Sequence, residues 1–121
     1  MIKLSLSRQL IILLSASPES QNASIALKLA NKVVDKGYLV RIFLYSEAVG
    51  ISRVNDPRFK DLLEKLISRG VEVGVCAQCA IARGYIDSNL RAREINEKVA
   101  IIGFSDLAAW LKSSNKVLSI G

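Results

Sequence analysis

Apolar residues in this chain form short continuous runs, and small, polar or charged residues separate them. The first run, residues 9–14 (QLIILL), is almost uninterrupted, which is typical of a strand buried on both faces of a sheet. Its pattern therefore predicts a central strand. Four further runs predict strands at residues 39–45, 71–75, 99–102 and 116–120.

Between the strands, apolar residues recur at helical spacing. A first helix is predicted to open at Asn22 and to stop at Gly37. Asp56 as N-cap and Pro57 as first helical residue predict a second helix, which Gly70 ends. Shorter helices are predicted over residues 77–82 and after a capping Ser105, and loops over residues 46–55 and 85–98.

Strands that alternate with helices specify an α/β fold with a parallel sheet. Right-handed crossovers place helices on both faces, so we expect a three-layer sandwich of about five mostly parallel strands. The 121 residues suit one compact domain spanning residues 1–121.

Composition narrows the possible functions. The net charge of +6 would suit nucleic acid, an anionic membrane or an acidic protein, but the basic residues are scattered and have no aromatic platform. Direct nucleic-acid binding is therefore not expected.

No apolar run approaches the about 18 residues of a membrane span, so we expect a cytoplasmic protein. Histidine is absent, which argues against a metal site and against Cys/His catalysis.

Candidate chemistry gathers after the third predicted strand, where Cys76 stands at the start of a predicted helix. Helix N–H groups and the helix dipole favour a thiolate, so Cys76 is predicted to be a nucleophile with a lowered pKa. Cys79, one turn further on, is either a packing residue or a resolving thiol, and its pKa is predicted to lie above that of Cys76. Arg83 either stabilises the sulfur anion or forms a surface ion pair, with Asp87 as one candidate partner.

Two other loops are expected beside this sulfur, because carboxyl ends of parallel strands meet at one edge of a sheet. They are residues 15–22 and 46–55, which follow the first and second predicted strands. Tyr45 and Glu47 could line the site or be solvated loop residues.

Val75-Cys76, followed by small residues and then Arg83-Gly84, resembles the DsrE/DsrF/TusD-like sulfur-relay family. The similarity extends over nearly the whole chain, including the first strand with its Ser-Pro loop and the closing segment 116–121. It implies a flavodoxin-like fold, a homo-oligomer (trimer or hexamer) and a cysteine, here Cys76, that carries sulfane sulfur as a persulfide. Cys79 departs from the pattern of many relatives.

The leading hypothesis is therefore a sulfurtransferase-like sulfur carrier that exchanges sulfur with donor and acceptor proteins and needs no metal or organic cofactor. A dithiol–disulfide oxidoreductase using Cys76 and Cys79 is the first alternative, although the proline of the thioredoxin pattern has only Pro18 as a candidate at this edge. A flavin or nucleotide binder is the second, with residues 15–22 as a phosphate loop that lacks glycine.

Overall fold

The computed structural model describes residues 8–89, 91 and 94–121 of the chain. Within this part, five strands form one sheet in the order β4-β3-β2-β1-β5, and each neighbouring pair is parallel. The strands are β1 Gln9–Leu14, β2 Leu39–Leu44, β3 Glu72–Cys76, β4 Ala100–Ile102 and β5 Lys116–Ile120.

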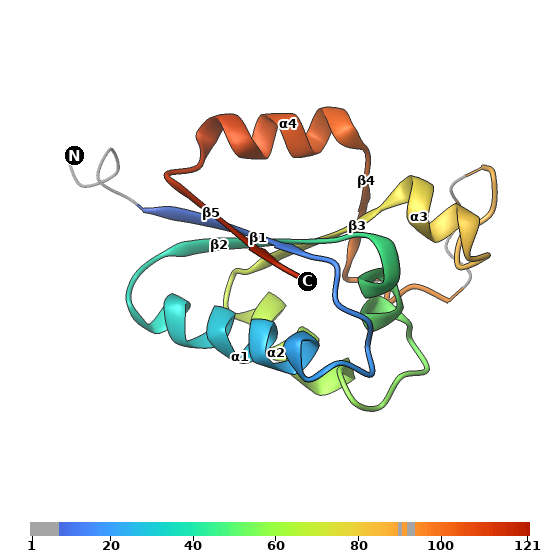
Figure 1. The fold of residues 1–121 in the computed structure, drawn as a ribbon, viewed down its shortest axis with the longest axis horizontal. Coiled ribbons are helices and arrows are strands. Elements are labelled where there is room, and N and C mark those ends of the chain that lie inside the picture. Colours follow the sequence, from blue (N-terminus) through green and yellow to red (C-terminus); the bar gives the residue numbers. More distant parts are fainter. Residues whose placement is uncertain (1–7, 90, 92–93) are drawn as a thin grey trace.

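Helices cover both faces of the sheet (Figure 1). Helices α1 (Gln21–Asp35) and α2 (Lys60–Ser68) lie on one face, and α4 (Phe104–Ser113) lies on the other. The short helix α3 (Ala77–Ala82) and the 3-10 helix η2 (Ser46–Ser52) lie beyond the carboxyl ends of the strands. The predicted flavodoxin-like α/β sandwich is confirmed, and its strands are parallel throughout.

The strand order explains why three loops meet at one edge. Strands β1 to β4 follow each other side by side, and α4 then carries the chain back across the sheet to β5, next to β1. Because all strands run in one direction, the segments that leave β1, β2 and β3 emerge at the same edge. This edge carries both cysteines.

The core forms mainly between the sheet and α1 and α2. Helix α1 presents small and apolar side chains to the sheet, because Ala23, Ala26, Leu27 and Ala30 recur at helical spacing and are fully buried. The opposite face is less covered, since α4 has no fully buried residue and β5 is largely exposed.

Two predicted helix starts and one predicted loop differ from the structure. Asp56 accepts the Arg58 N–H (3.0 Å), but a turn follows and α2 begins only at Lys60. Helix α4 begins at Phe104, before the predicted cap, because the Asp106 carboxylate already accepts the N–H of the residue preceding the helix (3.1 Å). Residues 46–52, predicted as a loop, form η2. Its buried residues lie beside the ends of β2 and β3 and against α3.

Candidate functional site

Cys76 is the last residue of β3, one residue later than the predicted strand end, and it directly precedes α3. It pairs in register with Ile102 of the neighbouring β4. The side chain belongs to the apolar core, and only 2% of the residue is exposed. The strand end thus positions Cys76 as predicted, but with its sulfur almost entirely enclosed.

Enclosure changes the electrostatics of Cys76. Burial raises the pKa of its thiol, because the charged form loses hydration, and this outweighs the backbone N–H groups of Cys79 and Gln78, which lower it. The side chain and charge of Cys79 raise this pKa further. The predicted lowering of the Cys76 pKa by the helix N-terminus is therefore wrong, since α3 has only six residues and desolvation exceeds its field.

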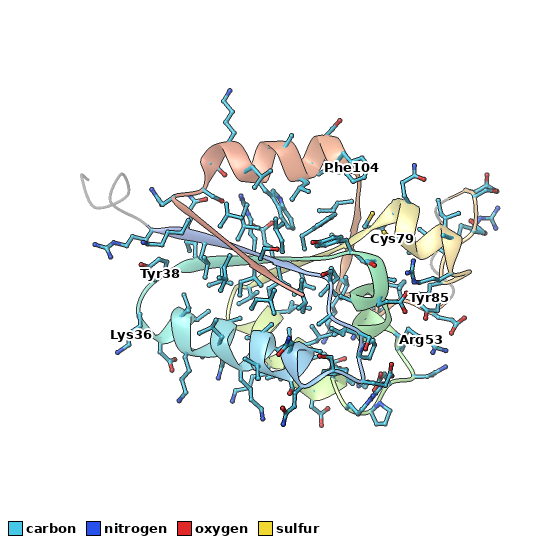
Figure 2. The ribbon with its side chains drawn as sticks, viewed as in Figure 1. Lys36, Tyr38, Arg53, Cys79, Tyr85 and Phe104 are labelled. Carbon is cyan, nitrogen blue, oxygen red and sulfur yellow. The ribbon has the colours of Figure 1, made fainter. Side chains whose placement is uncertain are left out.

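Cys79 is partly exposed on α3. Its Sγ accepts a hydrogen bond from the backbone N–H of Ser46 at 3.2 Å. Ser46 is the single described non-glycine residue with a positive φ, 54°. Residues other than glycine rarely adopt this backbone conformation. The turn from β2 into η2 thereby directs a backbone donor at the sulfur of Cys79. Figure 2 shows Cys79 at the same end of the sheet as Tyr85 and Arg53.

Arg83 ends α3 and joins it to η2. Its guanidinium donates to the Cys79 carbonyl oxygen at 3.2 Å and to the Glu47 carboxylate at 2.5 Å. The hydrogen bond that Arg83 donates to Glu47 is the main reason why the pKa of Arg83 is raised, and the charge of Cys79 contributes in the same direction. Asp87, the partner suggested from the sequence, instead accepts N–H groups within its own loop.

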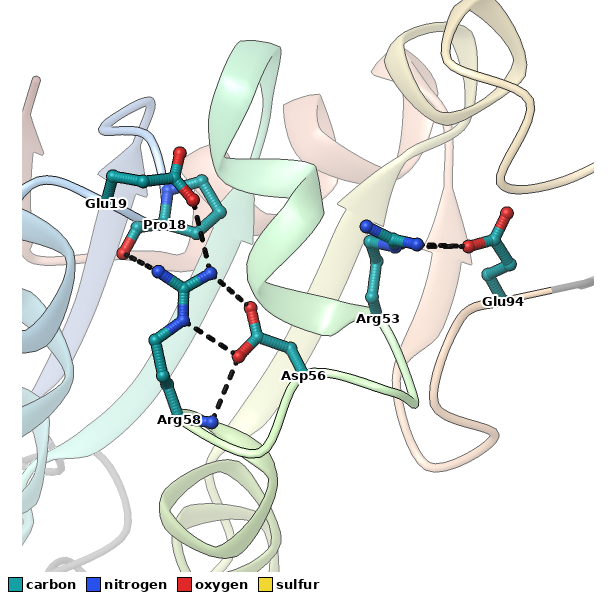
Figure 3. Close-up of polar contacts among 6 residues, drawn as sticks. All are labelled: Pro18, Glu19, Arg53, Asp56, Arg58 and Glu94. Carbon is teal, nitrogen blue, oxygen red and sulfur yellow. Dashed lines mark hydrogen bonds and ion pairs between the residues drawn. The ribbon is translucent and has the colours of Figure 1, made fainter.

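The loop after β1 contacts the segment that follows β2, at the same edge of the sheet as the cysteines. Arg58 donates to the Pro18 carbonyl oxygen (3.3 Å), to Glu19 (3.2 Å) and to Asp56 (2.7 Å), as Figure 3 shows. Pro18 also lies so close to η2 that a Cβ added at Gly50 would stand 2.9 Å from its Cγ. These contacts fix the loop after β1 against the segment that follows β2.

The segment before β4 contacts the end of η2. Arg53 binds Glu94 at 2.6 Å (Figure 3) and lies over the ring of Tyr85, 5.0 Å from its centroid. A pocket of about 120 Å³ lies between these elements. Its charged lining balances three guanidinium groups against three carboxylates: Arg53, Arg58, Arg83, Glu19, Glu47 and Asp56. An electrically balanced pocket of this kind does not favour a phosphate ligand.

Two further observations concern the described part of the chain. No three Cys, Asp or Glu side chains there gather closely enough to hold a metal ion. No helix in that part combines the length and the apolar character that a bilayer span requires.

The sequence reasoning brought together Cys76, Cys79 and Arg83, and it named Glu47 only as a possible lining residue. It missed the N–H group of Ser46. Every residue except proline has a backbone N–H, and no sequence motif predicts that a serine will adopt a positive φ, so the sequence does not reveal this donor. The two partners of the Cys79 bond are 33 positions apart in sequence.

Comparison with known proteins agrees with this architecture. Residues 8–120 match the model of the DsrE/DsrF-like family. The uncharacterized protein MJ0989 of Methanocaldococcus jannaschii is 28% identical over 114 residues, which cover 90% of this chain and 96% of that protein.

Solved structures show the same fold. The YchN protein of E. coli superposes with a TM-score of 0.78 at 27% identity, covering 93% of this chain and 98% of that one. A protein of unknown function, MTH1491 of Methanobacterium thermoautotrophicum, reaches a TM-score of 0.78 at 12% identity, with 93% and 99% covered. The match of the family model over nearly the whole chain shows that this protein belongs to the DsrE/DsrF-like family.

Proposed function

We propose that this protein is a sulfur-relay carrier that holds sulfane sulfur as a persulfide on Cys76 and passes it to the thiol of a partner protein. Family membership suggests a role in sulfur relay. The observation that carries the proposal is the pair of free thiols, Cys76 and Cys79, at the carboxyl end of β3, where reactive groups of such sheets gather.

The chemistry requires only thiol exchange. A thiolate attacks the outer sulfur of a donor persulfide, a new S–S bond forms, and the donor's own S–S bond breaks with its electron pair leaving on the donor sulfur. The carrier then holds a persulfide, and the reverse reaction with an acceptor thiol unloads it. No net oxidation occurs, so this reaction itself consumes no redox cofactor.

Burial of Cys76 supports a storage role. Water and small reductants reach a sulfur that is 2% exposed far less readily than one on the surface. A persulfide there would last between encounters with partner proteins.

Intact mass spectrometry tests the proposal. After one equivalent of polysulfide and removal of the donor, the wild type should carry one added sulfur that reductant removes, and peptide mapping should locate it on Cys76. Cys79→Ser should retain the same final load, whereas Cys76→Ser and the double variant should retain none. Equal retention by Cys76→Ser would show that the storage residue is wrong.

The same experiment separates the carrier from the dithiol–disulfide oxidoreductase. An oxidoreductase would release sulfide and leave a reversible Cys76–Cys79 disulfide, with no sulfur mass retained. The mass of the product, lower by two hydrogens rather than higher by one sulfur, distinguishes the two.

We also propose that the protein is a homo-oligomer, a trimer or larger. Helix α4 on one face of the sheet exposes Phe104 and Leu111, and the edge strand β5, which pairs only with β1 among the described residues, exposes Val117 and Leu118. Sedimentation at micromolar concentration should give a trimer or larger, and a monomer would contradict this proposal alone.

A further inference from the structure

The enclosure of Cys76 creates a problem for sulfur transfer between proteins. Thiol exchange requires the attacking and leaving sulfurs to touch, and its rate depends on access and on the fraction of thiolate. Cys76 is deficient in both respects, because only 2% of the residue is exposed and burial raises its pKa. A partner's persulfide cannot reach this sulfur directly in the structure described above.

Cys79 differs from Cys76 in its access to solvent and in its polar contacts. It is partly exposed, and the Ser46 N–H donates to its Sγ at 3.2 Å. The guanidinium of Arg83 is held beside it, because it binds both the Cys79 carbonyl oxygen and the Glu47 carboxylate. A hydrogen-bond donor and a neighbouring cation both favour the anionic form of a sulfur.

We infer that Cys79 is the exchange thiol of this carrier: sulfur enters and leaves through Cys79, and Cys76 stores it behind Cys79. This inference deepens the proposed function and depends on it. It assigns to Cys79 a catalytic role, since its sulfur forms and breaks bonds with the partner. Ser46, through its backbone N–H, and Arg83 are positioning residues.

The route consists of two balanced exchanges. First, the Cys79 thiolate attacks the outer sulfur of the partner's persulfide, and the partner's thiolate leaves. Second, Cys76 attacks the outer sulfur of the Cys79 persulfide, its proton passes to the departing Cys79 sulfur, and the sulfane sulfur ends on Cys76. The two cysteines are one helical turn apart, and the side chain and charge of Cys79 raise the pKa of Cys76. Unloading follows the reverse order.

Loading kinetics with a protein donor test this route. A persulfidated rhodanese domain serves as the donor, and single-turnover transfer is followed by quenching with an alkylating reagent and intact mass. Cys79→Ser should load about tenfold more slowly or worse, because the donor must then wait for Cys76 to become exposed. Cys76→Ser should accept sulfur at the wild-type rate but return it to the donor's free thiol by the reverse exchange, so that none is retained once the donor is separated.

A second measurement tests the surroundings of Cys79. The rate of alkylation of Cys79 in the Cys76→Ser background, followed across pH, should shift to higher pH in Arg83→Gln. Arg69→Gln is the matched control, because Arg69 ends α2 at the opposite edge of the sheet and binds Asn31 and Asp35. It should leave the alkylation profile unchanged.

The outcomes are separable. If Cys79→Ser loads as fast as the wild type and sulfur still ends on Cys76, the inference is wrong and the proposed function stands. If neither cysteine of the wild type retains sulfur from this donor or from polysulfide, the proposed function itself is wrong. An identical profile for Arg83→Gln and Arg69→Gln would remove Arg83 from the assignment.

Discussion

Gly74 offers a sharp test of how the sheet beside the site is packed. It lies in β3, two residues before Cys76. A Cβ built at this position would lie 2.8 Å from Cδ1 of Ile102 and 2.9 Å from Cη2 of Trp110. Both distances are shorter than carbon atoms tolerate, so in Gly74→Ala the side chains of Ile102 and Trp110, or the elements that carry them, must shift.

The expected magnitude follows from two opposing effects. Overpacking a core position costs about 1–3 kcal/mol. Replacing glycine by alanine within a strand contributes about 0.5–1 kcal/mol in the opposite direction, because the unfolded chain loses freedom. Taking the middle of both ranges, Gly74→Ala should lower the free energy of unfolding by about 1–2 kcal/mol. With an unfolding entropy of about 2.1 cal/mol/K per residue, this corresponds to a Tm lower by about 4–8 °C.

Urea unfolding followed by circular dichroism measures this change, and a double-mutant cycle assigns its cause. Ile102→Val removes the methyl group that makes the nearer of the two contacts and should itself cost about 0.5–1.5 kcal/mol. The double variant Gly74→Ala/Ile102→Val should lose less stability than the sum of the two single variants. Additive losses, or a Gly74→Ala variant as stable as the wild type, would refute the reasoning from close packing.

Three further predictions concern single groups. Burial raises the pKa of Cys76, so the stabilising contribution of its neutral thiol is fully present below the unfolded pKa of about 8.5 and disappears as pH rises through the folded pKa. Above about pH 8.5, stability should therefore fall more steeply in the wild type than in Cys76→Ala. Parallel curves of stability against pH would contradict this. Arg58→Ala should lower stability at pH 7 and weaken the loss of stability as pH falls below about 4, because the hydrogen bond from Arg58 lowers the pKa of Asp56, whose carboxylate stabilises the fold above its unfolded pKa; an unchanged acid titration would count against it. Gly37→Ala should cost about 1 kcal/mol in thermal unfolding although nothing lies within 4 Å of the new Cβ, because Gly37 has a φ of +88°.

The sequence by itself determined the order in which strands and helices follow one another along the chain. Continuous apolar runs, helical spacing and glycine stops are local signals, so β1 and β5 have the predicted bounds and β2 and β3 differ by one residue at their ends. The position of Cys76 at a strand end follows from the same signals. Helix starts were less accurate, because Asp56 and Ser105 are good caps in isolation but the chain turns differently around them.

Only the tertiary structure decided which cysteine is enclosed and what surrounds the other. Burial of Cys76 depends on the packing of β4 and α3 around it, which no local pattern encodes. Arg83 binds Glu47, 36 positions away, rather than the nearby Asp87, because η2 folds back against α3. The donor to Cys79 is a backbone N–H whose direction depends on the positive φ of Ser46. Solvent access and hydrogen-bond direction are set by contacts between distant segments, and they determine the chemistry that each thiol can perform.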